Sequence, residues 1–178
     1  MAEEEEMLDD ELQQMFVESE RAKVLDSHTF SQPVHFLKRI DPICLEEGAT
    51  VQQAMETMIA KKIGCMLITR KRKLTGILTE GDVARKIVGA KKDATKILVE
   101  NFMTKDPESF EPGVTIAYVL NAMVVGGYRH IPLVNGKHEP IAVISVNDIV
   151  RHLVSFFSEE VLNLPPKPMN TTKDREGA

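Results

Sequence analysis

The chain has little cysteine and no tryptophan. Its two cysteines, Cys44 and Cys65, are too few for a disulfide framework and lack the paired spacing of a metal site. The histidines show no ligand spacing with one another or with the cysteines, so we predict no metal site. We expect both cysteines to be small buried side chains.

Long apolar runs are also missing. The run from Leu153 to Phe157 is far too short to span a bilayer, and the N-terminus MAEEEEMLDDELQQ is acidic where a signal peptide would be basic and then apolar. We therefore expect a cytoplasmic protein with no membrane association. The motifs GxSxG, GK[ST] and HExxH are absent from the sequence, so we expect no enzyme.

Charge is unevenly spread along the chain. Residues 1–20 hold nine of the 27 acidic residues and no basic one, which leaves 18 acidic against 22 basic residues, a net charge of +4, for residues 21–178. This excess is too small to indicate a nucleic-acid-binding protein, but it suits a body that binds a small anion. The basic stretch 70–73 (RKRK) is expected to be a solvated turn, with nucleic-acid contact as a lesser option.

Two stretches of the chain repeat one another. IDPICLEEGATVQQAMETM, from Ile40, matches TKDPESFEPGVTIAYVLNAM, from Thr104, with the Asp-Pro pairs 65 residues apart. GILTEGDVARKIV, from Gly76, matches AVISVNDIVRHLV, from Ala142, at an offset of 66. Such a repeat predicts two copies of one structural unit.

Each copy predicts the order β-α-β-β-α. A short strand follows each Asp-Pro pair, and apolar residues then recur at i, i+3, i+4, i+7 and i+8, which is typical of an amphipathic helix. These faces consist of Val51, Ala54, Met55, Met58 and Ile59 in the first copy and Ile116, Val119, Leu120, Met123 and Val124 in the second. Two strands, expected at 63–69 and 74–78 and again at 129–134 and 140–144, precede a second helix. Residues 93–103 are expected to form a helical linker.

The predicted fold class is therefore α/β (α+β). One unit alone would bury its apolar faces poorly, so two units packed sheet to sheet with pseudo-twofold symmetry are expected. We divide the chain into an acidic N-terminal helical segment (1–33), a first repeat (34–90), a second repeat (91–160) and a polar tail (161–178).

These motifs together resemble the CBS domain, named after cystathionine beta-synthase. The resemblance rests on Asp-Pro, G-x-T-(V/I) and A-M, followed by IGCMLIT or YRHIPLV and then GILTEGD or AVISVND, all in order and twice, over residues 34–157. Tandem CBS pairs, or Bateman modules, are regulatory sensors that bind adenosine-containing ligands between the repeats and often dimerise. The resemblance thus implies AMP, ADP, ATP or S-adenosylmethionine as a regulatory ligand, no catalytic cofactor, and a homodimer that signals to an unknown partner protein.

The Ser/Thr-x-x-Asp pairs can be understood in two ways. Ser145 with Asp148, and Thr79 with Asp82, have the spacing of a capping box at the start of a helix. The same helix N-terminus offers free N–H groups to an anion, and in the family such pairs contact ribose and phosphate. We keep both functions open for these four residues.

Arg129 and His130 stand at the entrance of an apolar strand. They could be a surface arginine and a surface histidine with no ligand. Alternatively they bind phosphate, because arginine donates bidentate hydrogen bonds to phosphate oxygens and an anion would raise the pKa of the histidine. The resemblance implies the phosphate role. The next residues, Ile131 and Pro132, are candidates for the floor of the base-binding slot.

The resemblance places further base-binding residues on the first strand of each repeat. The candidates are Ile40, Pro42 and Ile43 in the first repeat, and Met103, Thr104, Asp106, Pro107 and Glu108 in the second. Each could equally be ordinary core or turn. Gly64 and Cys65 replace the Arg-His pair in the first repeat, so we predict two unequal sites, the stronger one at Ser145 and Asp148.

The chain ends allow a second hypothesis. Leu8, Leu12, Met15 and Phe16 predict an acidic amphipathic helix, which could dock on the body, on a dimer mate or on a partner. The chain would then be a ligand-independent scaffold with the CBS fold. At the other end, the apolar face from Ile149 to Leu162 suggests a dimer interface.

Overall fold

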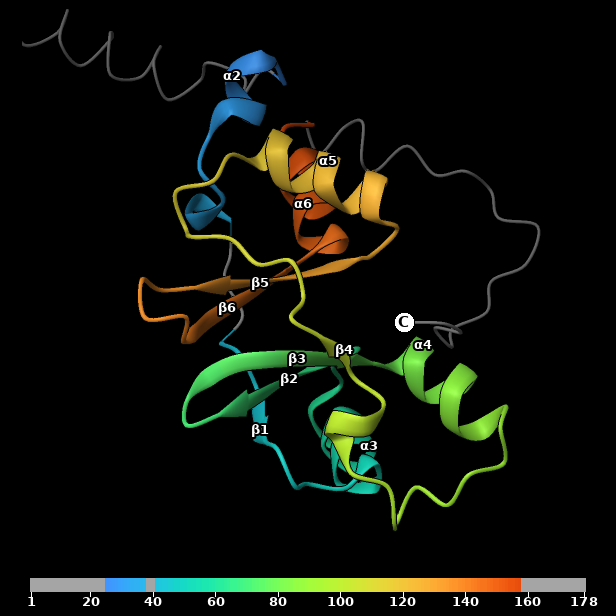
Figure 1. Cartoon of the computed structure of the whole chain (residues 1–178). Helices are drawn as coiled ribbons and strands as arrows, with labels where there is room; N and C mark the ends of the chain where they lie inside the picture. The colour runs from blue at the N-terminus through green and yellow to red at the C-terminus, as the bar shows by residue number, and fades with distance from the viewer. Residues whose placement is uncertain (1–24, 38–40, 158–178) are drawn as a thin grey trace, which may run out of the picture.

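The computed structural model describes residues 25–37 and 41–157. The predicted helix at residues 8–16 and the predicted tail at 161–178 lie outside these ranges. Two lobes with separate hydrophobic cores make up the fold, and their sheets face each other while most helices lie on the outer sides (Figure 1). The predicted α+β class is confirmed.

The first repeat has the predicted order. Strand β1 (Cys44–Glu46) pairs in parallel with β2 (Cys65–Arg70), which pairs antiparallel with β3 (Lys73–Thr79). Helix α3 (Val51–Lys61) lies between β1 and β2, and β3 runs into α4 (Glu80–Val83), which continues as the π-helical turn η2 (Ala84–Val88).

The second repeat departs from this order at its start. It contains α5 (Ile116–Gly126), β5 (His130–Val134), β6 (Pro140–Ser145) and α6 (Val146–Val154). The strand predicted after Asp106-Pro107 is reduced to one parallel bridge between Phe110 and Leu133. The two-residue strand β4 (Thr104–Lys105) precedes the Asp-Pro pair and joins the first repeat's sheet, next to β3.

The linker prediction was wrong. Within residues 93–103 the only helical element is the single 3-10 turn η3 (Val99–Asn101). The Asp93 carboxylate accepts a hydrogen bond from the Thr95 amide (3.0 Å), a local turn that competes with helix formation. Two linker carbonyls, of Ala94 and Ile97, instead accept hydrogen bonds from the first amides of α3, so they cap that helix.

The two lobes exchange flanking segments. Helix α2 (Ser27–Ser31) lies before the predicted first repeat (34–90), and the 3-10 turn η1 (Val34–Phe36) lies at its start. Val34 and Leu37 nevertheless pack in the core of the second repeat. In the other direction, Val99 and Met103 pack in the core of the first repeat. Each lobe is therefore completed by chain that sequence order assigns to the other.

A third apolar cluster joins the lobes. Leu67, Leu74 and Ile77 from the first sheet meet Val134 from the second, with Val143 packed alongside. These residues form the predicted sheet-to-sheet contact. None of the helices in the described part of the chain combines the length and apolar character that crossing a bilayer requires.

Two expectations about burial failed. Ile59 and Val124, placed on the buried faces of α3 and α5, are 75% and 74% exposed. They occupy equivalent positions in the two repeats, at the outer edge of each apolar stripe. Cys44 was expected to be buried but is exposed, because it lies on the edge strand β1, whereas Cys65 is buried.

Candidate functional site

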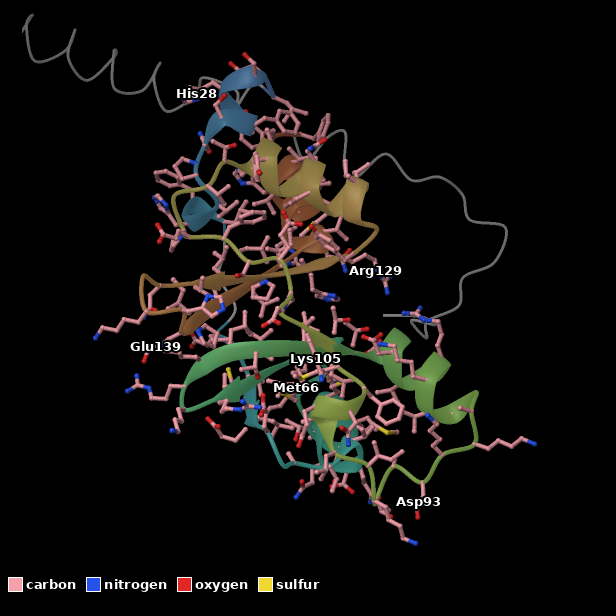
Figure 2. All side chains as sticks on the ribbon, viewed as in Figure 1. His28, Met66, Asp93, Lys105, Arg129 and Glu139 are labelled. Carbon is pink, nitrogen blue, oxygen red and sulfur yellow. The ribbon has the colours of Figure 1, made fainter. Side chains whose placement is uncertain are left out.

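A cleft of about 340 Å³ opens between the two repeats. Its second-repeat wall includes Arg129, His130, Ser145 and Asp148, four of the predicted site residues. Figure 2 shows Arg129 at the start of β5, between the two halves of the molecule. The volume lies within the range of small-molecule sites.

The Ser145–Asp148 pair forms the predicted capping box at the start of α6. One carboxylate oxygen, Asp148 Oδ2, accepts hydrogen bonds from the Ser145 amide (2.8 Å) and hydroxyl (2.6 Å). The Ser145 hydroxyl in turn lies 3.3 Å from the Asp148 amide, from which it accepts a hydrogen bond. The other oxygen, Oδ1, accepts from Arg151 Nη1 at 3.2 Å. The Arg151 side chain is 70% exposed, so a ligand could displace it from this oxygen.

His130 lies deeper in the cleft than its neighbour. Burial lowers its pKa, as does the guanidinium of Arg129, whereas the carboxylates of Glu80 and Asp148 act in the opposite direction. The ring is therefore mostly neutral near pH 7 in the unliganded chain. A bound anion would reverse this balance, because it favours the charged imidazolium.

The first repeat forms the opposite wall. Asp41, Ile43 and Gly64 line it, together with Lys62 and Glu80. Gly64 lies next to His130 and Glu80, since a Cβ built on it would be in van der Waals contact with His130 Cε1 (3.6 Å) and Glu80 Oε1 (3.7 Å). The cleft is thus lined by three carboxylates (Asp41, Glu80 and Asp148), three cations (Lys62, Arg129 and Arg151) and His130.

Four of these charged residues, Asp41, Lys62, Glu80 and Arg151, were not predicted from the sequence as site residues. Arg151 could have been found, because it lies three residues after Asp148 on a predicted helix. Lys62 has a left-handed backbone with φ of 54°, where its counterpart in the second repeat is Gly127. A lysine in a position that favours glycine was a usable signal. Glu80 enters the cleft only through the packing of the two repeats.

The first repeat's own capping box differs in its surroundings. Asp82 Oδ2 accepts from the Thr79 amide (3.1 Å) and hydroxyl (2.7 Å), as in the second repeat. Its Oδ1 lies 2.8 Å from Lys86 Nζ, which also donates to the Phe102 carbonyl at 3.0 Å. Burial alone would raise the pKa of Asp82, but the hydrogen bonds from Lys86 and Thr79 outweigh it and lower the pKa. The chain's own lysine therefore satisfies this carboxylate.

The structure places most of the other described candidates away from the 340 Å³ cleft. Ile131 and Pro132 are buried along β5, and Ile40 lies outside the described residues. Of the first-strand candidates, Ile43 lines the cleft and its neighbour Pro42 does not. The second-repeat group, Thr104, Asp106 and Pro107, is also absent from the lining. The described residues hold no group of three or more His, Cys, Asp or Glu side chains placed to bind a metal.

A second hollow, about 800 Å³, lies on the helical side of the first repeat. Met55, Ile59, Val83 and Val88 give it a mainly apolar lining. It reaches Lys62, Gly64 and Glu80, which it shares with the cleft.

Comparison with known proteins agrees with this architecture. The CBS domain family matches residues 37–89 and 99–155, more than half of the chain. Among curated proteins, the chain is 31% identical over 118 residues to the Arabidopsis thaliana CBS domain-containing protein CBSCBSPB3, covering 65% of this chain and 20% of that protein. It is 27% identical over 126 residues to protein MJ1225 of Methanocaldococcus jannaschii, covering 70% and 44%. The chain thus spans less than half the length of these two relatives.

Solved structures show the same fold. The CBS-domain protein ATU1752 from Agrobacterium tumefaciens matches with a TM-score of 0.58 and 25% identity, over 64% of this chain and 89% of that one. The CBS domain pair of protein MJ0100, solved in complex with 5′-methylthioadenosine and S-adenosyl-L-methionine, matches with a TM-score of 0.63 and 21% identity, over 70% and 97%. The chain belongs to the CBS-domain family and carries two CBS domains in tandem.

Proposed function

We propose that this chain is a regulatory module that binds one adenosine-containing ligand in the cleft between its repeats. The observation that carries the proposal is the convergence of the Ser145–Asp148 capping box and the Arg129–His130 pair with the Gly64 wall of the other repeat. A ligand there would contact both repeats, so its binding energy would depend on how the repeats pack.

The cleft offers a separate partner for each part of such a ligand. The Asp148 carboxylate is an acceptor for ribose hydroxyls, and it lies in the first turn of α6, where the helix dipole favours an anion. Arg129 can bind phosphate through charge-assisted hydrogen bonds, and His130 can add a donor once the anion has raised its pKa. Ile43 and Val143 provide apolar surface for a base.

We infer that the first-repeat site is the weaker one. Asp82 is bridged by Lys86 to the Phe102 carbonyl, so a ligand there would have to break two existing contacts. Asp148 instead contacts Arg151, whose side chain is 70% exposed and which donates to it at 3.2 Å. The proposal therefore expects one occupied site per chain.

The chemistry of the cleft limits the candidate ligands. Arg129 and His130 favour a phosphate, hence AMP, ADP or ATP. The carboxylates Asp41 and Glu80 keep S-adenosylmethionine, a sulfonium cation, among the candidates. The MJ0100 pair, which shares the fold, shows that an adenosine-containing ligand can be held by such a module.

The exposed apolar side chains support a homodimer. Ile59 and Val88 on the first repeat, and Val124 and Val125 on the second, are each at least 65% exposed. Ile59 and Val88 line the same hollow, Val124 and Val125 are neighbours on α5, and exposed apolar patches mark interaction sites. The proposal assigns no catalytic step to the chain, and the cytoplasmic location and the regulated partner protein stay predictions.

A thermal-shift panel tests the proposal. Nucleotide-free full chain is melted alone and with AMP, ADP, ATP or S-adenosylmethionine at millimolar concentration. A ligand at about 100 times its dissociation constant stabilises by roughly 2.7 kcal/mol, which a melting curve resolves. Arg129→Ala should abolish the shift given by a phosphate-bearing ligand, whereas Arg85→Ala, an exposed arginine of the first repeat, should keep it. If no ligand shifts the wild type, the sensor proposal fails and the scaffold hypothesis, whose acidic helix lies outside the described residues, takes its place.

A further inference from the structure

The tips of the two long hairpins meet at one end of the molecule. The β2–β3 turn at Lys71 and Arg72 belongs to the first repeat, and the β5–β6 loop at 135–139 belongs to the second. The Leu74 amide donates to the His138 carbonyl at 3.0 Å, and Arg72 Nε lies 3.4 Å from Glu139 Oε1. Figure 2 shows Glu139 at this end and Asp93 at the far end of the first repeat.

This meeting point is strongly basic. We call it the hairpin-tip surface; it consists of Glu47, residues 70–73 and residues 137–139. It holds five Lys or Arg residues against Glu47 and Glu139, which gives a net charge of +3 without His138. Arg70 and Arg72 are 68% and 82% exposed, and Lys71, Lys73 and Lys137 are exposed as well.

The two carboxylates of the surface do not neutralise it. Glu47 is engaged by Arg70. Asn135 donates to Glu139 at 2.9 Å and is the main cause of the lowered pKa of Glu139, to which Arg72, Lys137 and Lys73 add. Cations from both repeats thus act on one glutamate and remain in excess around it.

The backbone of the β2–β3 turn adds a second observation. Lys71 and Arg72 both have positive φ, 50° and 69°, a conformation that two-residue hairpin turns usually reserve for Asn and Gly. Positive φ is sterically unfavourable for lysine and arginine alike, because both carry a Cβ. A strained turn that presents two cations points to a function for their charge.

We propose that the hairpin-tip surface binds the acidic segment at residues 1–20 of the same chain. That segment carries nine acidic residues and no basic one, which complements the surface. Glu6 is 19 residues before Leu25, the first described residue, and an extended chain of that length reaches roughly 60 Å. A compact body of this size has a radius of gyration of about 14 Å, so the surface lies within reach. Tethering also gives the segment a high effective concentration.

Amide chemical shifts of the full chain test this contact. A variant with Glu3→Gln, Glu4→Gln, Glu5→Gln and Glu6→Gln should shift the amides of residues 70–73 and 137–139 relative to the wild type. The amides of residues 91–96, at the far end of the first repeat, should not move. Raising the salt concentration from about 0.01 M to about 1 M shortens the Debye length from roughly 30 Å to 3 Å and should produce the same shifts in the wild type.

A matched pair of variants isolates the charge of the turn. Lys71→Asn with Arg72→Gly removes two cations while giving the turn residues that prefer its backbone. In this background the four glutamine substitutions should no longer move residues 137–139. The control, Lys91→Asn with Lys96→Gln, removes two exposed cations elsewhere and should leave the response intact.

Three results would overturn the proposal. In the first, the tip amides ignore both the glutamine substitutions and the salt. In the second, their response grows with protein concentration, which would assign the acidic segment to a second copy. In the third, they respond to added single-stranded RNA but not to the glutamine substitutions, which would make the surface a nucleic-acid contact.

Discussion

The two capping boxes allow a prediction in which each serves as control for the other. Asp148→Ala removes the carboxylate that accepts from the Ser145 amide and hydroxyl, and the same change at Asp82 removes the equivalent group of the first repeat. Loss of an N-terminal cap costs about 1 kcal/mol. The associated ion pairs add up to about 1 kcal/mol each, because Arg151 and Lys86 are partly exposed.

Both variants should therefore lose about 1–2 kcal/mol of stability. For a chain of this length, 1 kcal/mol corresponds to roughly 2–4 °C in melting temperature, so both midpoints should fall by about 2–8 °C. An adenosine-containing ligand at about 100 times its dissociation constant should raise the melting temperature of the wild type by roughly 5–10 °C. Asp82→Ala should keep this ligand-induced rise, and Asp148→Ala should lose it.

Thermal denaturation of the wild type and both variants, with and without ligand, decides between the outcomes. A loss of stability in both variants, with loss of the ligand response in Asp148→Ala alone, is the expected result. The reasoning is refuted if Asp148→Ala keeps the ligand-induced shift, or if Asp82→Ala is the variant that loses it. Unchanged midpoints in both variants would contradict the stabilising role of the caps.

Three further predictions follow from burial and charge. Binding of a phosphate-bearing ligand should raise the pKa of His130 from its depressed value, so ligand affinity should rise as the pH falls through the bound-state pKa and level off below the free-state pKa. Titration calorimetry between about pH 8 and pH 6.5 should show proton uptake on binding, which His130→Gln removes. An affinity that does not change with pH would argue against a phosphate at this histidine. Val124→Asp places a charge on the exposed apolar face of α5 and should convert the proposed dimer to monomer in analytical ultracentrifugation. A wild type that is already monomeric would disprove the assignment of this face. In the native protein a thiol reagent should modify the exposed Cys44 and spare Cys65, because burial raises the pKa of Cys65 to about 12; mass spectrometry that finds Cys65 labelled at the same rate would show that the core around it opens readily.

The internal repeat made the larger part of this architecture predictable. The i, i+3, i+4 spacing predicted α3 and α5, and the Ser/Thr-x-x-Asp spacing predicted the capping boxes at the starts of α4 and α6, all of which the structure contains. These features are local, so the sequence around each one is sufficient to specify it. Ser145, Asp148, Arg129 and His130 were predicted to form one site because all four belong to the second repeat, and the structure places them in one cleft.

What the sequence did not predict depends on contacts between distant segments. The linker at 93–103 was expected to be helical, but its carbonyls cap α3, a partner that precedes it by more than 40 residues. Glu80 lies in the same cleft as His130, and acts on its pKa, only because the two repeats pack together. Similarly, Ile59 and Val124 fit an apolar stripe in sequence, and only the packing shows that no described residue covers them. Propensity and periodicity carry no information about such tertiary choices.

Titration calorimetry of the nucleotide-free full chain with AMP tests the central claim most directly. The account predicts saturable binding of one AMP per chain, because Asp148 and Arg129 share an open cleft whereas Lys86 occupies the equivalent carboxylate in the first repeat. Two equivalent sites per chain would contradict the inequality of the repeats. No binding of AMP, followed by none of ADP, ATP or S-adenosylmethionine at millimolar concentration, would contradict the claim that the cleft is a sensor site.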